Sequence, residues 1–307
     1  MSSPPELDRG LVIASHGRHV VVETPEGRQL ICHPRGKKNQ AVVGDRVLWL
    51  ASTDEGSIEK VEERRNLFYR QDELRTKSFA ANLDQVLILI AAEPEFSESQ
   101  LARALIAAEA ERITPLIVLN KSDLAELFAR AWDRLEPYRR MGYTVLPLGL
   151  KAQGDSGLSA LRTQLQGRST LVLGPSGAGK STLINRLVPG AQAQTGEIST
   201  ALNSGKHTTT STRWYWVDGA RSTALIDSPG FQEFGLQHIE AAQLAGLMPD
   251  LRTHAGECRF YNCSHLHEPG CGVIAVVDKQ AGGPGISPSR YRIYGELHAE
   301  LSQAPRY

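Results

Sequence analysis

The sequence lacks any apolar run near the roughly 20 residues that a membrane-spanning helix needs. The segment from Met1 to Gly10 also lacks a basic stretch leading into an apolar one, so we expect no signal peptide. Net charge is absent too, because 34 Lys and Arg residues balance 34 Asp and Glu residues. These absences predict a cytoplasmic protein without a membrane partner, in which any nucleic-acid surface must come from local clustering of cations.

Cysteine is scarce, with four residues in the chain, and three of them fall close together. Cys258, Cys263, His265 and Cys271 supply three thiols and one imidazole, the usual ligand set of tetrahedral structural zinc. In a cytoplasmic protein such a cluster favours a metal site over disulfides. We predict one structural Zn²⁺ at these four residues, with His267 as an alternative ligand to His265 and reduced cysteines without metal as the competing interpretation.

The length of 307 residues suggests two or three domains. Residues 1–70 carry short β-prone runs between Gly and Pro turns, which predict a small barrel, although this pattern does not separate an OB barrel from an SH3-like one. Residues 71–240 alternate apolar strand runs with helical stretches, which predicts a doubly wound α/β domain. Residues 241–307 hold the cysteine cluster and a predicted helical tail.

A phosphate-binding loop stands in the α/β region. The segment Gly-Pro-Ser-Gly-Ala-Gly-Lys-Ser fits the pattern G-x-x-x-x-G-K-[ST] between a predicted strand and a predicted helix. Lys180 would reach the β- and γ-phosphates and support catalysis, and Ser181 would bind Mg²⁺. The predicted phosphate contacts are Gly174, Pro175, Ser176, Gly177, Ala178, Gly179, Lys180, Ser181 and Thr182.

The run Asn120, Lys121, Ser122 and Asp123 follows another predicted strand and separates GTP from ATP. The Asp123 carboxylate can accept hydrogen bonds from guanine N1–H and N2–H₂, a donor pair that adenine lacks. Asn120 would tie this loop to the phosphate loop, and the Lys121 stem would cover the base. The motif predicts GTP and GDP as ligands, and it makes an ATP-dependent RNA enzyme a weaker alternative.

A third nucleotide motif, Asp-Ser-Pro-Gly, follows a predicted strand at residues 224–226. Asp227 would hold the Mg²⁺ shell, and the Gly230 N–H would face the γ-phosphate. Before it lies the threonine-rich segment 205–210, typical of a loop that closes over Mg²⁺ in the triphosphate state. We assign Thr209 as its magnesium ligand, with the two flanking threonines left open.

The order of these motifs is unusual, because the guanine motif precedes the phosphate loop and the Asp-Ser-Pro-Gly motif. Joining the old termini and opening the chain elsewhere gives this order, so we predict a circularly permuted GTPase domain. Phe231 stands where many GTPases place a water-orienting glutamine, which predicts slow hydrolysis by the protein alone. His207 is the candidate catalytic group for orienting water, and a plain loop histidine is the alternative.

Together these motifs resemble the bacterial RsgA (YjeQ) family of ribosome small-subunit-dependent GTPases over nearly the whole chain. The resemblance includes the barrel segment 42–47, the permuted motif order and the segment 268–271, Glu-Pro-Gly-Cys, which closes the zinc knuckle. One departure is Gly149-Leu150-Lys151, where the family has a Ser-Ala-Lys loop at the base. That contact is partly through the backbone, so we expect guanine binding to survive.

The resemblance implies a circularly permuted α/β P-loop GTPase domain with an N-terminal all-β OB-type barrel and a C-terminal zinc-binding, mostly helical domain. It implies that the partner is the 30S ribosomal subunit, with its 16S rRNA, late in maturation. It also implies hydrolysis of GTP to GDP and phosphate that the subunit stimulates.

Cations cluster on the barrel and favour RNA phosphates, with Arg35, Lys37 and Lys38 as the predicted contacts. We expect a monomer with no DNA partner. The main alternative is an RNA-binding module with a degenerate nucleotide site, which a nucleotide competition assay would separate from a GTPase.

Overall fold

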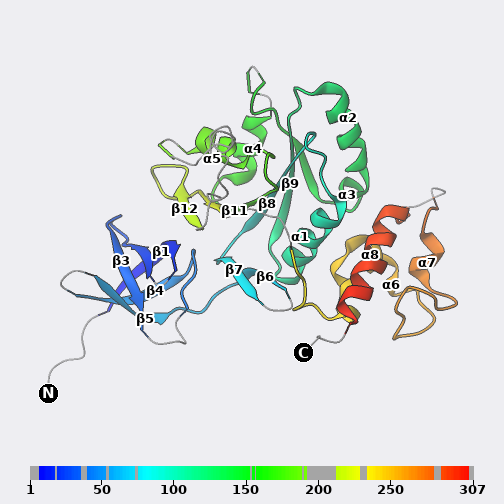
Figure 1. Cartoon of the computed structure of the whole chain (residues 1–307), viewed down its shortest axis with the longest axis horizontal. Helices are drawn as coiled ribbons and strands as arrows, with labels where there is room; N and C mark the ends of the chain where they lie inside the picture. Colours follow the sequence, from blue (N-terminus) through cyan, green and yellow to red (C-terminus); the bar gives the residue numbers. More distant parts are fainter. Residues whose placement is uncertain are drawn as a thin grey trace, which may run out of the picture.

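The structure is a computed structural model that describes residues 7–17, 19–35, 40–52, 55–72, 75–152, 154–155, 157–188, 190–191, 212–228, 234–279 and 285–303. Figure 1 shows an N-terminal barrel and a C-terminal helical part on opposite flanks of a central α/β domain. No helix in these ranges is long and apolar enough to cross a membrane.

Five strands form the N-terminal barrel. They are β1 (Asp8–His16), β2 (His19–Glu23), β3 (Gln29–Pro34), β4 (Arg46–Ala51) and β5 (Gly56–Val61). They pair in the order β1-β2-β3-β5-β4, and β4 returns to β1, which closes the barrel. The interior holds inward-facing side chains that include Val12, Val22, Val47, Trp49 and Ile58. The predicted barrel is confirmed, and its order is that of a five-stranded OB barrel.

Six further strands form the sheet of the central domain. They are β8 (Gln85–Ala91), β9 (Thr114–Asn120), β10 (Thr144–Pro147), β11 (Ser169–Leu173), β12 (Arg213–Trp216) and β13 (Ala224–Asp227). Their order is β10-β9-β8-β11-β13-β12, and only the β12–β13 pair is antiparallel. The doubly wound α/β domain predicted from the alternating pattern is therefore confirmed.

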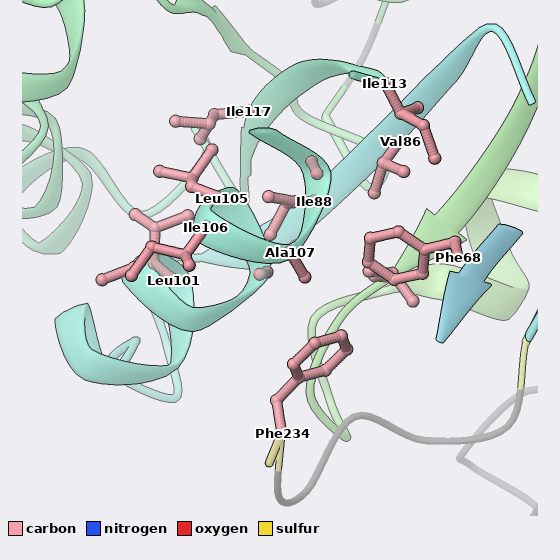
Figure 2. Close-up of a cluster of buried hydrophobic side chains, with 14 of the residues drawn as sticks. Phe68, Val86, Ile88, Leu101, Leu105, Ile106, Ala107, Ile113, Ile117 and Phe234 are labelled. Atoms are coloured by element: carbon pink, nitrogen blue, oxygen red, sulfur yellow. The ribbon is translucent and has the colours of Figure 1, made fainter. Parts of the chain in front are cut away.

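Helices cover both faces of this sheet. They are α1 (Glu98–Ala110), α2 (Ala125–Arg134), α3 (Glu136–Arg140), α4 (Leu158–Leu165) and α5 (Lys180–Leu187). Strand β8 is buried at every position, and its successive residues face opposite sides. Ile88 belongs to the cluster formed with Leu101 and Leu105 of α1 (Figure 2), whereas Leu87 belongs to the cluster that contains Leu183 of α5.

Local sequence explains two helix boundaries. Helix α1 begins with a side-chain cap, because the Ser97 hydroxyl accepts a hydrogen bond from the Gln100 N–H at 3.3 Å. The following helical stretch is divided into the two helices α2 and α3. Pro137 stands in the first turn of α3, where its missing N–H is tolerated but would interrupt a longer helix.

The barrel and the central domain share one sheet. Ala14 of β1 pairs with Arg213 of β12, so the eleven strands form a continuous sheet. Strand β1 bulges between Val12 and Ala14, and this bulge changes which way its side chains point. Val12 fills the barrel, while Ile13 packs into the main core of the central domain. The two parts are thus joined by both backbone and apolar contacts.

The C-terminal part packs on the side of the central domain away from the barrel. It consists of the 3₁₀ helix η1 (Ala241–Leu247) and the helices α6 (Pro249–Ala255), α7 (Gly272–Val276) and α8 (Pro288–Leu301). Arg290 of α8 is 1% exposed and makes two hydrogen bonds of 2.9 Å to the Asp250 carboxylate. Its guanidinium also lies 5.3 Å from the ring centroid of Tyr138 in α3. This buried pair fixes the C-terminal helices against the central domain.

Replacing Asp250 with alanine would leave the Arg290 charge buried without its counterion. We expect Asp250→Ala to lower the free energy of unfolding by about 3–5 kcal/mol, measured by urea denaturation. Arg292→Ala is the control, because it removes an exposed pair with Glu296 on the same helix and should cost less than about 0.5 kcal/mol. Equal losses for the two variants would contradict a structural role for the buried pair.

Candidate functional site

The phosphate loop, residues 174–181, connects β11 to α5 at the carboxyl ends of the parallel strands, where nucleotides bind in such sheets. Gly179 has a φ of 104°, and a Cβ there would lie 2.4 Å from Nδ2 of Asn120. A Cβ at Gly174 would lie 2.4 Å from the Leu89 carbonyl oxygen. Both positions require glycine, and the open backbone leaves room for N–H groups to turn toward a phosphate.

Asn120 joins the two halves of the site. Its side chain is 3% exposed, and its Nδ2 donates to the Ala178 carbonyl at 2.8 Å. Its Oδ1 accepts from the Leu150 N–H at 3.2 Å. One buried amide thus connects the guanine motif, the phosphate loop and the segment 148–152, which we call the base loop.

The rest of the guanine motif lies along the base loop. Ser122 donates its N–H to the Leu148 carbonyl at 3.0 Å, and the Lys121 ammonium donates to the Glu93 carbonyl. Asp123 is exposed, and no residue in the described part of the chain pairs with its carboxylate. The carboxylate is therefore open to a base that offers two adjacent N–H donors.

Lys180 and Asp227 form a pair of oppositely charged side chains at the phosphate site. The Lys180 ammonium donates to the Ser228 carbonyl at 3.1 Å and lies 3.6 Å from Oδ1 of Asp227. Asp227 is 4% exposed, and burial raises the pKa of its carboxyl, an effect that the Lys180 charge opposes. Its Oδ1 is buried without a hydrogen bond. A buried carboxylate oxygen in this state, beside Lys180 at the start of α5, fits the hard oxygen ligands that Mg²⁺ prefers.

Several predicted residues fall outside the ranges that the structure describes. They are His207, Thr209 and Gly230 of the nucleotide site, Phe231 beside it, and the predicted RNA contacts Lys37 and Lys38. Their roles stay predictions. Of the RNA contacts only Arg35 is described, and it is an exposed side chain whose guanidinium donates to both carboxylate oxygens of Glu59 at 3.0 Å.

Two residues of the site were missed by sequence reasoning. Leu150 is 5% exposed and packs in the cluster of Leu183 and Leu187 on α5, so its side chain anchors the base loop in the core. Arg186 of α5 donates from Nη2 to the Leu150 carbonyl at 2.8 Å. The signal was the departure at Gly149-Leu150-Lys151, where an apolar residue replaces a small one. The base loop of this chain is held by contacts with the phosphate-loop helix.

The four predicted zinc ligands come together. Their ligand atoms all lie within 4.8 Å of one another, and this is the candidate metal cluster among the described residues. The Cys258 and Cys271 sulfurs are 3.8 Å apart, and the His265 Nδ1 lies 3.4 and 3.5 Å from them. Zinc–sulfur bonds of about 2.3 Å in a tetrahedron place two sulfurs about 3.8 Å apart, so the spacing fits one zinc ion. The alternative ligand, His267, is exposed and outside this group.

The surroundings of the cluster hold the ligand turn in place. Glu268 accepts hydrogen bonds from the N–H of Ser264 at 2.8 Å and from its hydroxyl at 2.7 Å, and these bonds hold the pKa of Glu268 far below its usual range. Tyr291 donates its hydroxyl to the His265 carbonyl at 2.8 Å. Such outer contacts orient a ligand turn before the metal binds.

Comparison with known proteins identifies relatives over nearly the full chain. A profile of the RsgA GTPase family matches residues 61–237. A protein from Variovorax paradoxus named small ribosomal subunit biogenesis GTPase RsgA is 77% identical over 299 residues, which cover 97% of this chain and 94% of that protein. The crystal structure of YjeQ from Thermotoga maritima superposes with a TM-score of 0.74 at 28% identity, covering 97% of this chain and 100% of that one. The structure of YloQ, described as a circularly permuted GTPase, has a similar fold, with a TM-score of 0.70 at 24% identity and 98% of each chain covered.

The bond from Arg186 to the base loop predicts an effect on nucleotide affinity. Removing a charge-assisted hydrogen bond at a partly exposed site costs about 1 kcal/mol, so we expect Arg186→Ala to weaken GDP binding about 5-fold. Titration with a fluorescent GDP measures this change. Arg162→Ala on helix α4 is the control, because it removes an exposed arginine with no partner among the described residues. The same loss in both variants would contradict the positioning role.

The ligand set predicts one zinc ion per chain, measured by elemental analysis after dialysis. We expect Cys263→Ser to lose most of the zinc, because a hydroxyl is a poor replacement for a thiolate ligand. Cys32→Ala is the control, since Cys32 is buried in the barrel and belongs to no such cluster. Full zinc content in Cys263→Ser would exclude the assigned site.

Proposed function

We propose, from the fact that the chain belongs to the RsgA GTPase family, that it hydrolyses GTP in the biogenesis of the small ribosomal subunit, and does so while bound to that subunit. The GTPase activity follows from the family itself. The ribosomal role is the one named for the relative that is 77% identical over 97% of this chain. The observation that supports the GTPase activity is the buried Asn120 amide, which joins a phosphate loop to a guanine motif with an open carboxylate.

Guanine selection would rest on Asp123. A carboxylate that accepts from N1–H and N2–H₂ would be left unpaired by adenine, and this penalty gives discrimination of several orders of magnitude where the site is desolvated. The base loop would border the same edge of the base, because Ser122 bonds to Leu148. The base loop is held in position by the hydrogen bond between Leu150 and Asn120 and by the bond from Arg186 to the Leu150 carbonyl.

Phosphate chemistry would rest on Lys180, Ser181 and Asp227. Lys180 already lies at the floor of the loop, and its ammonium would donate to the β- and γ-phosphate oxygens. Ser181 and Asp227 would hold Mg²⁺, which offsets charge on the phosphates when it is bound. With Phe231 in place of a water-orienting glutamine, the protein alone would turn over slowly, and His207 or a group from the subunit would orient the water.

Within the small subunit, the protein would contact the 16S rRNA. The closed barrel carries exposed Arg35, and Lys37 and Lys38 follow it in sequence, so its cations suit phosphate contacts. The combination of an OB-type barrel and a GTPase domain in one chain supports a switch that binds RNA in one nucleotide state and releases it in the other. The protein would act late in subunit maturation, in the cytoplasm and as a monomer.

GTP hydrolysis with purified 30S subunits tests this function. We expect a stimulation of about 10-fold or more, because the partner would supply or order the group that positions water. The 50S subunit and ATP are the negative controls, and Lys180→Ala should abolish the stimulated rate. Hydrolysis that ignores 30S would overturn the ribosomal role while leaving a guanine-specific hydrolase.

A further inference from the structure

Strand β12 lies between the barrel and the nucleotide site. In the sheet, Arg213 of β12 is the register partner of Ala14 in β1 on one side and of Asp227 in β13 on the other. Neighbouring strands are about 4.8 Å apart, so the barrel strand is about 10 Å from the backbone of the magnesium candidate. A single strand therefore separates the two functional parts of the chain.

A buried acid fastens β12 and its hairpin to the barrel. Glu23 at the end of β2 is 6% exposed, and its Oε1 accepts from the Trp216 Nε1–H at 2.7 Å. Arg221, in the turn between β12 and β13, lies 3.7 Å from the same carboxylate and donates to the Pro25 carbonyl at 3.3 Å. These three contacts cross from the barrel to the central domain, and we call them the Glu23 clasp.

Apolar packing closes the same junction. Ile13, which faces away from the barrel interior, is buried in one cluster with Val43 of the barrel and Trp214 of β12. Trp214 and Trp216 contact each other edge to face, with centroids 5.3 Å apart. Because packed interiors shift as units rather than deform smoothly, a displacement of β12 would carry the barrel with it.

We infer that β12, held by the Glu23 clasp, transmits the nucleotide state from Asp227 to the barrel and so couples GTP binding to RNA binding. This inference rests on the proposed function and gives it a route. Coupling between two binding sites is reciprocal, so the subunit would change the affinity for the GTP form by the same factor. The residues of the clasp touch neither ligand; they are positioning residues.

The test compares affinities for the 30S subunit with a non-hydrolysable GTP analogue and with GDP, and takes their ratio as the coupling factor. We expect Glu23→Ala and Trp216→Phe each to lower this factor about 3-fold or more. The affinity of the free variants for each nucleotide should stay within about 2-fold of the wild type, because the nucleotide contacts are intact. Trp216→Phe keeps an aromatic ring in the junction and removes only the N–H donor, so it tests the clasp with the smallest loss of packing.

Arg9→Ala is the matched control, because Arg9 lies on β1, the barrel strand that pairs with β12, and its exposed pair with Glu62, at 3.8 Å, belongs to the barrel alone. It should leave the coupling factor unchanged. A wild-type chain that does not bind 30S would overturn the proposed function itself. Wild-type binding with a coupling factor that both clasp variants retain, or with no nucleotide dependence at all, would overturn the role of β12 and leave the GTPase assignment standing.

Discussion

The site depends on one buried amide. Asn120 must satisfy its donor and its acceptor inside the core, since each unpaired polar group there costs about 1–3 kcal/mol. It does so with Ala178 and Leu150, which lie 58 and 30 residues away in sequence. The bond is possible because β9 and β11 flank β8 in the sheet, and their carboxyl ends meet at one edge. The order of the strands in the sheet thus brings the nucleotide motifs together, although the permutation changes their order along the chain.

The permutation also decides where the other two parts attach. Strand β13 ends at Asp227, and the chain resumes in the described structure at Phe234, which packs against Phe68 and Phe79 of the hairpin β6 (Leu67–Gln71) and β7 (Thr76–Ala81). Gly235 bonds to Gln71 of that hairpin before the chain enters the C-terminal helices. The barrel joins the sheet through the pairing of β1 with β12, and β12 is the neighbour of β13. The C-terminal part is therefore attached through the β6–β7 hairpin, and the barrel is attached through β12.

Sequence reasoning succeeded where the signal is local. The continuous apolar runs of β8 and β9 predict strands buried on both faces, and the glycine spacing of the phosphate loop reports a backbone need at Gly174 and Gly179. It failed where partners decide the outcome. Strand β12 has four residues and two tryptophans, with no alternation to mark it, and it pairs with β1, which is distant in the sequence. The Arg186 bond was invisible for the same reason, because it joins a helix to a loop 36 residues earlier.

Electrostatics gives a reason why a ligand at the phosphate site would affect the edge of the sheet. Burial disfavours the charged form of Asp227, and the Lys180 charge opposes that effect. A triphosphate with Mg²⁺ would change both sides of this balance, because the phosphates would interact with Lys180 and the cation would bind the carboxylate. The strand that carries Asp227 pairs with β12 at that same residue, so this change in charge would fall on the ladder that carries the barrel. In this chain the barrel is therefore attached to the sheet one strand away from the carboxylate that would meet the cation.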